Sequence, residues 1–141
     1  MSTVTLAADS STLVLNGRAI TDFVDGDTIL ITPVNELTAH TRSNKSLNIQ
    51  QRSDGRVHDV TFRLPKYSDD DRFMGSVIAS DTPVVVNGSC KEDYQINGQA
   101  RTTTWTLENG SVTVQPTDTK NNQDGNILME YVIRFNRAVR L

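Results

Sequence analysis

Few residues in this 141-residue sequence are of types that perform nucleophilic or metal chemistry. His40, His58 and Cys90 are far apart along the chain, and neither histidine stands beside an obvious nucleophile. No Gly-x-Ser-x-Gly segment occurs, so a nucleophilic triad has little support. We therefore predict structural roles for both histidines, at the surface or at an interface.

Two polar segments could be proposed as metal sites. The loop at 120–125 is superficially similar to a calcium loop, but its first position is Lys120, and Tyr131 stands where a bidentate glutamate is required. The run Asp69–Asp71 follows Ser68, and carboxylates in a first helical turn suit the positive end of the helix dipole. The sequence predicts no enzyme activity, no metal site and no cofactor.

Composition favours short strands joined by polar turns. Hydrophobic residues make up 36% of the chain and aromatic residues 6%, which are low values for a globular domain. Thr, Asn, Ser and Asp are correspondingly frequent. A net charge of −3 gives no overall basic footprint for binding nucleic acid. One cysteine excludes an internal disulfide framework. Neither a signal peptide nor a membrane-spanning segment is predicted.

The clearest local pattern runs from Val57 to Ala79. Apolar and polar residues alternate over 59–64, which predicts a half-buried strand. Pro65 ends that strand, and Ser68 is the predicted N-cap of a helix. The helix has one apolar stripe, formed by Phe73, Met74, Val77 and Ile78.

Asn-Gly pairs divide most of the remaining sequence into hairpins. The predicted turns are at Asn16–Gly17, Asn87–Gly88, Asn97–Gly98 and Asn109–Gly110. The predicted strands are 13–15, 19–24, 29–31, 83–86, 89–96, 103–107, 112–114 and 128–135. Residues 29–31 and 128–135 are apolar on both faces, which predicts strands in the interior of a sheet, although Pro33 indicates a nearby edge or bulge.

Residues 38–53 predict a long hairpin with a polar tip that projects from the body as an arm or a mobile loop. We expect a single domain over residues 1–141, with residues 1–10 flexible or ordered by a neighbouring molecule. The predicted class is mainly β, with two packed antiparallel sheets in a sandwich or partly closed barrel, one flanking helix and the projecting hairpin. Trp105 is expected in the core near Ile133 or Phe135.

In this order of elements the sequence resembles the small tail tube proteins of tailed bacteriophages, a family related in fold to phage-like injection tubes. The residues that carry the resemblance are Gly55–Ser68 with Phe73, Met74 and Ile78, then Gly88–Tyr94, Thr103, Trp105 and Leu107, with Asp27–Thr32 upstream. The segment Pro65–Tyr67 and the long loop at 116–126 depart from the family pattern.

The resemblance implies a structural virion protein whose hexameric rings stack into a tube that conducts DNA into the host. It also implies self-association, contacts with baseplate and tail terminator proteins and, where the tail has a sheath, with sheath proteins, and a lumen that holds tape measure protein and DNA without binding either specifically. The protein would be made in the host cytoplasm and reside in the tail. The residues themselves, apart from the resemblance, determine neither the ring symmetry nor the presence of a contractile sheath.

Three groups of residues are candidates for assembly. The arm would contact a neighbouring ring through Thr38, His40, Arg42, Asn44, Lys45 and Ser46. Glu108 and Glu130 would face the lumen, or else the solvated outside, because each lies opposite the aromatic face of its strand. Arg137 and Arg140 would form a C-terminal subunit contact, or else a solvated tail.

The sequence is also compatible with two other functions. A ring protein that terminates the tube or lies beside the baseplate would share most of these features. A stand-alone β-sandwich that binds a ligand such as a carbohydrate would instead expose aromatic side chains on a flat face.

Overall fold

The computed structural model describes residues 1–7, 10–123, 125 and 127–141. Ala8 and Asp9, in the segment predicted to be flexible, and Asp124 and Asn126, in the predicted polar loop, lie outside the described residues. The elements are β1 (Val4–Thr5), β2 (Ser11–Leu15), β3 (Arg18–Ile20), β4 (Leu30–Pro33), β5 (Thr38–Arg42), β6 (Leu47–Gln51), β7 (His58–Pro65), α1 (Asp69–Ile78), β8 (Val86–Ile96), β9 (Gln99–Val114) and β10 (Leu128–Arg140).

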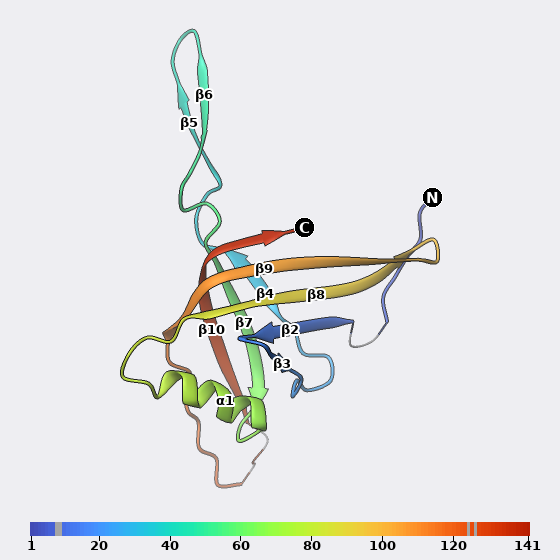
Figure 1. Cartoon of the computed structure of the whole chain (residues 1–141), viewed down its shortest axis with the longest axis vertical. Coiled ribbons are helices and arrows are strands. Elements are labelled where there is room, and N and C mark those ends of the chain that lie inside the picture. Colours follow the sequence, from blue (N-terminus) through green and yellow to red (C-terminus); the bar gives the residue numbers. More distant parts are fainter. Residues whose placement is uncertain (8–9, 124, 126) are drawn as a thin grey trace.

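One eight-stranded antiparallel sheet forms the body (Figure 1). Its strands follow the order β3-β2-β8-β9-β10-β7-β4, and β1 pairs with β8 at Gln95 and Ile96. β5 and β6 form a separate hairpin that projects from the body. The mainly β class, the helix and the projecting hairpin are confirmed.

The strand β10 joins the two halves of the sheet. Leu128–Phe135 pairs with β7, whereas Val132–Arg140 pairs with β9. The two expected sheets are therefore continuous through β10, and the described strands form no closed barrel. The prediction that 128–135 lies in the interior of a sheet is confirmed.

The core is built mainly from alternating side chains of β2, β7 and β10, together with residues of β9 and α1. Its fully buried members include Leu13, Leu15, Val60, Phe62, Leu64, Met74, Leu107, Ile133 and Phe135. The predicted apolar stripe of the helix is confirmed, because Met74 is buried and Phe73, Val77 and Ile78 pack against the core. Ser68 caps α1 as predicted, its hydroxyl accepting a hydrogen bond from the Asp71 N–H at 3.2 Å.

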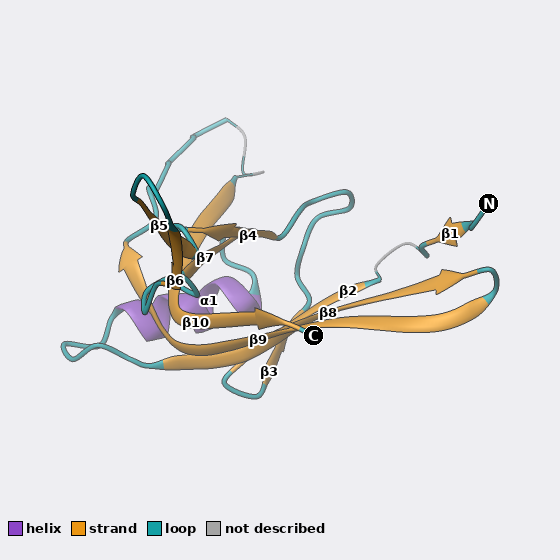
Figure 2. Cartoon of the chain, turned by 90° about the horizontal axis from the view of Figure 1, so that it is seen from above, coloured by secondary structure: helices purple, strands orange, loops and turns teal. Residues whose placement is uncertain are grey.

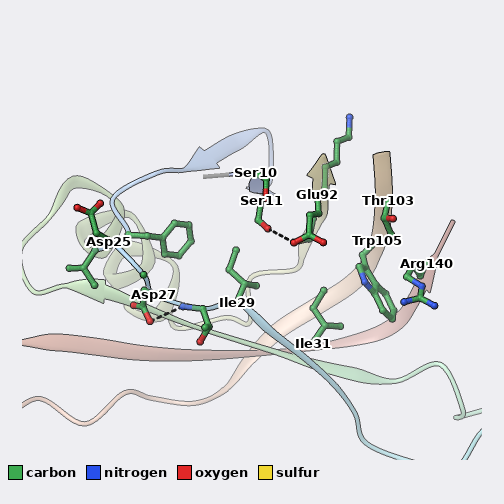
Figure 3. Close-up of a pocket in the computed structure, with 16 residues that line it drawn as sticks. Ser10, Ser11, Asp25, Asp27, Ile29, Ile31, Glu92, Thr103, Trp105 and Arg140 are labelled. Carbon is green, nitrogen blue, oxygen red and sulfur yellow. Dashed lines mark hydrogen bonds between the residues drawn. The ribbon is translucent and has the colours of Figure 1, made fainter. Parts of the chain in front are cut away.

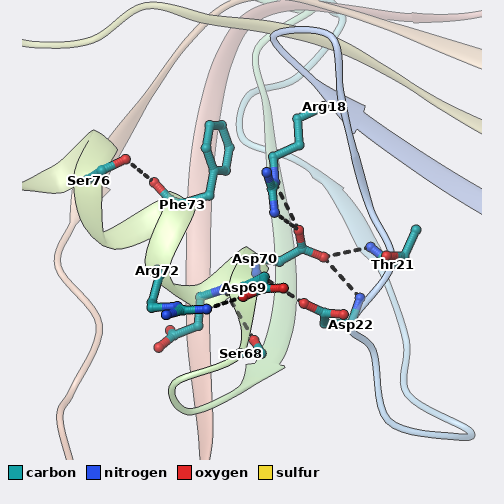
Figure 4. Close-up of polar contacts among 10 residues, drawn as sticks. Arg18, Thr21, Asp22, Ser68, Asp69, Asp70, Arg72, Phe73 and Ser76 are labelled. Atoms are coloured by element: carbon teal, nitrogen blue, oxygen red, sulfur yellow. Dashed lines mark hydrogen bonds and ion pairs between the residues drawn. The ribbon is translucent and has the colours of Figure 1, made fainter.

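The carboxylates at the start of α1 point to different partners (Figure 4). Buried Asp70 accepts hydrogen bonds from the backbone N–H groups of Thr21 and Asp22 at 2.7 and 3.0 Å, and from Arg18 Nε at 3.0 Å. In turn, Asp22 Oδ2 accepts a hydrogen bond from the Asp70 N–H at 3.0 Å. These bonds fix the start of α1 to the segment that follows β3.

Two of the four predicted Asn-Gly turns are wrong. Asn16–Gly17 and Asn97–Gly98 are true turns with positive φ at both residues. By contrast, β8 continues through Asn87–Gly88 and β9 continues through Asn109–Gly110, where the register between them shifts. These pairs are therefore irregularities within long strands, of the kind that bends a sheet.

An asparagine network explains why the strands continue. The Asn109 N–H donates to Asn87 Oδ1 at 2.9 Å, and the Asn87 N–H donates to Asn16 Oδ1 at 2.9 Å. Side-chain amides thus satisfy backbone donors that the irregular ladder leaves free. The predicted strand at 83–86 shrinks accordingly, since only Val86 of that segment belongs to β8.

The prediction that residues 29–31 are buried on both faces is also wrong for the isolated chain. β4 is an end strand of the sheet, paired with β7 on one side, and Leu30 is 54% exposed. The edge predicted from Pro33 is confirmed, because a residue without an N–H is tolerated at an edge. An apolar strand at a free edge offers a pairing surface.

Candidate assembly surfaces

The arm, residues 38–53, stands clear of the body (Figure 1). Its tip closes between Ser43 and Ser46, where the Ser43 N–H donates to the Ser46 carbonyl at 2.8 Å. Its base is held by the Arg52 N–H, which donates to the Leu37 carbonyl at 2.9 Å. A Cβ on Gly55 would lie 2.9 Å from Leu37 Cα, so the close approach of the chain at the base requires glycine.

The two faces of the arm differ. Residues opposite each other on antiparallel strands project to the same face, and His40 pairs with Ile49 and Arg42 with Leu47. Leu47 and Ile49 are 45% and 61% exposed. One face therefore presents two aliphatic side chains beside His40 and Arg42, with no covering element of its own chain.

The arm is also the basic part of an acidic protein. Residues 38–53 contain Arg42, Lys45 and Arg52 and no carboxylate. Arg52 forms an ion pair with Asp54 at the base, whereas no described residue pairs with Arg42 or Lys45. All six predicted arm residues are brought together in one hairpin, with Thr38 at its base and the rest exposed.

Sequence reasoning missed a second projection. β8 and β9 run past β2 and β10, because β2 begins at Ser11, opposite Glu92, and β10 ends at Arg140, opposite Trp105; beyond these points only the two-residue strand β1 pairs with β8 among the described residues. The resulting lateral hairpin, residues 93–102, extends from the body roughly across the direction of the arm (Figures 1 and 2). Its turn at Asn97–Gly98 was predicted, but the wrong turn at Asn109–Gly110 concealed the length of β9.

An open groove of about 900 Å³ lies between the 23–31 segment and the strands β2, β8 and β9 (Figure 3). Its apolar lining includes Phe23, Ile29, Ile31 and Trp105. Its charged lining residues are Asp25, Asp27, Lys91, Glu92 and Arg140. Asp25 forms no ion pair with a described residue, and Glu92 accepts a hydrogen bond from the Ser11 hydroxyl at 3.2 Å.

Asp27 is the most constrained polar residue of the groove. Its side chain is fully buried, and its Oδ1 accepts from Arg63 Nη2 at 2.7 Å and from the Thr28 N–H at 2.9 Å. Its Oδ2 is buried without a hydrogen-bond partner among the described residues. A buried oxygen of a carboxylate normally accepts at least one hydrogen bond, so this oxygen lacks a donor.

Trp105 corrects one prediction. It lies half-buried at the groove, opposite Cys90 and Arg140 in the sheet register, and it packs against the core cluster without being one of its buried members. Its ring meets that of His58 edge to face at 5.2 Å between centroids. The inward face of β9 was predicted correctly, but the sheet bends and leaves the part of that face at Trp105 uncovered.

Glu108 and Glu130 are exposed and turned away from the core, which is the face predicted for both. Glu108 Oε2 lies 3.9 Å from Arg137 Nε, and Glu130 stands opposite Arg63 in the β7–β10 register. Arg137 and Arg140 belong to the end of β10 rather than to a loose tail. The structure does not bring the two glutamates together, because they lie on different halves of the sheet.

The two remaining residues of chemically reactive types are His58 and Cys90. His58 Nδ1 lies 2.9 Å from the Arg56 carbonyl oxygen, and burial raises the pKa of the Cys90 thiol. The described residues hold no cluster of three His, Cys, Asp or Glu that could ligate a metal. No helix among them is long and apolar enough to cross a membrane.

No family model and no curated protein matches the sequence. Solved structures do match. A chain of an extracellular contractile injection system, the PVC sheath/tube terminator in its extended state, gives a TM-score of 0.64 at 8% identity, covering 97% of this chain and 96% of that chain. A chain of the PVC sheath-tube complex gives 0.60 at 9% identity, covering 97% and 91%. This chain therefore shares its fold with chains of the sheath-tube complex and of the sheath/tube terminator of an extracellular contractile injection system.

Proposed function

We propose that this protein is a structural subunit of a tail-like injection tube, built from hexameric rings of this chain stacked on one another. The observation that carries the proposal is the agreement in fold over 97% of the chain with components of a sheath-tube complex and its terminator. The arm and the free sheet edges supply a physical route to such an assembly.

Ring closure uses the two ends of the sheet. β3 and β4 each have one unpaired side, and Leu30 on β4 is exposed. Pairing an end strand with the sheet of the next copy satisfies backbone groups and covers apolar surface at once. A heterologous contact of this kind generates a ring when its rotation closes.

Contact between rings is assigned to the arm, because it extends beyond the body and carries uncovered aliphatic and cationic side chains. Glu108 and Glu130 are assigned to the lumen, where negative charge keeps DNA phosphates from binding. Arg137 and Arg140 are assigned to a C-terminal subunit contact. Sheath, baseplate and terminator proteins are the expected partners, and the tail is the expected location, after synthesis in the host cytoplasm.

Electron microscopy of the purified protein over a range of concentrations tests the proposal. We expect rings at moderate concentration and stacked tubes at high concentration, with sedimentation showing the same growth in solution. A monomer at every concentration would contradict the proposal.

A second candidate function is a terminating ring, favoured by the higher TM-score to the terminator chain. Rings that cap the ends of preformed tubes but never stack on one another would identify this function.

A further inference from the structure

We propose that the groove beside Asp27 is the receptor for the arm of another copy of this chain. The inference rests on the proposed function and deepens it by naming both halves of the contact. Its occupant is a second copy, because no arm residue lines the groove and the arm extends away from its own body (Figure 1).

The groove matches the apolar face of the arm. Phe23, Ile29 and Ile31 are half-buried along it and Trp105 lies at its side (Figure 3). The arm brings Leu47 and Ile49, which have no partner in their own chain. Seating these aliphatic side chains on the half-buried lining removes apolar surface from water on both sides.

The groove also matches the charge of the arm. Asp25 and Glu92 lie on the groove, and Arg42 and Lys45 are cations without an acidic partner among the described residues. The groove's own Lys91 and Arg140 leave Asp25 unpaired. Complementary charge fixes the register of such a contact and disfavours arm-to-arm association, because the arms carry like charge.

Asp27 gives the groove a specific requirement. Its Oδ2 is buried and lacks a donor, while the other oxygen is fully used by Arg63 and Thr28. Because Oδ2 is sealed from solvent, a guanidinium or ammonium group of another copy would donate to it only after the wall of the groove opens on docking, and would then complete the site with a charge-assisted hydrogen bond. Arg42 and Lys45 are the arm residues that carry such groups.

Cross-linking between two separately labelled copies tests the contact. Both copies carry Cys90→Ala, so that no native thiol competes. One carries Lys45→Cys and the other Asp25→Cys; they are mixed, assembled and treated with a short bismaleimide. We expect a covalent heterodimer. The matched control replaces Asp25→Cys by Arg72→Cys, on the 70% exposed side chain of α1, and should give none.

A charge swap provides the second readout. Arg42→Glu with Lys45→Glu should raise the protein concentration needed for assembly by about tenfold or more, because like charges would face each other in the groove. Asp25→Lys with Glu92→Lys in the same chain should restore assembly towards the level of the parent protein.

The outcomes separate the two proposals. Assembly without cross-linking at Asp25, or cross-linking through Arg72 instead, overturns the groove as receptor and leaves the tube function standing. Parent protein that stays monomeric at every concentration overturns both. Circular dichroism of each variant establishes that it is folded before it is scored.

Discussion

At the scale of single residues, the bond between Tyr131 and Asp71 ties the helix to the last strand. The Tyr131 hydroxyl is buried and donates to Asp71 Oδ1, while Asp71 Oδ2 accepts from the Tyr67 N–H at 2.9 Å. Burial of the phenol, and then the neighbouring carboxylate, raise the pKa of Tyr131 well above its usual value of about 10.

This shift predicts a loss of stability in alkali. A folded-state pKa raised above the unfolded value gives stability that is fully present below about pH 10 and lost as the pH rises towards the folded pKa. Ultraviolet titration should show Tyr131 ionising only as the protein unfolds. Tyr131→Phe should lower the free energy of unfolding by about 1–3 kcal/mol at neutral pH. Ionisation of Tyr131 near pH 10, in protein that circular dichroism shows to be folded, would contradict this.

Gly110 makes a second residue-scale prediction. A Cβ there would lie 2.5 Å from the ring of Phe135, which is fully buried. Gly110→Ala should therefore destabilise the protein by about 1–3 kcal/mol through overpacking. Gly75→Ala is the matched control, since nothing lies within 4 Å and the site is on α1. The control should stabilise by about 1 kcal/mol. Thermal melts that rank the two variants the other way would refute the packing argument.

At the scale of elements, structural features set by residues close together in the sequence were predictable, whereas features set by pairing between distant segments were not. The cap at Ser68 and the stripe of α1 depend on residues within one helix, and both were confirmed. An Asn-Gly pair favours positive φ whether it makes a turn or a bulge, so only the partner strands decide its role. Asn109 lies beside Asn87 through tertiary pairing, which no local pattern reports.

Of the two candidate assembly surfaces, the arm could be predicted from the sequence and the groove could not. The arm was predictable because 38–53 alternates weakly between sparse apolar residues and a polar tip. The groove was not, because Asp27, Glu92 and Trp105 come from three distant segments. The burial of Trp105 was overestimated because alternation identifies the inner face of a strand but not whether another element covers it.

Deleting Thr41–Ser46 tests the arm as an element. The deletion removes the tip and leaves the body untouched, since no described body residue bonds to those six residues. We expect a folded, soluble subunit with an unchanged melting temperature that no longer forms stacked tubes. Long tubes formed by the deletion variant in electron micrographs would rule out the arm as the contact between rings.

At the scale of the whole molecule, charge is divided between parts. The chain carries a net charge of −3, although residues 38–53 contain cations and no acid. The body therefore holds all of the negative excess, so that the proposed tube would pass DNA along acidic bodies and join its rings through basic arms. At a Debye length of about 10 Å, acids lining a narrow pore act on DNA phosphates that pass through it.

The lumen assignment predicts the effect of reversing two charges. Glu108→Lys with Glu130→Lys should leave assembly intact, because both side chains are exposed, and should slow or arrest DNA passage in a reconstituted particle. Glu108→Gln with Glu130→Gln is the control for lost charge without new attraction. Unimpaired delivery by the lysine variant would place both residues on the outside.

The double pairing of β10 has a mechanical consequence. Antiparallel ladder bonds lie perpendicular to the strands, and β10 is bonded to β7 along its first half and to β9 along its second. The arm leads into β7, and the lateral hairpin continues β9. A force that pulls these two projections apart therefore acts along the strands and loads many ladder bonds at once in shear, instead of breaking them one after another. In the proposed tube, such a subunit would carry tension from one ring to the next without losing its ladder bonds one at a time.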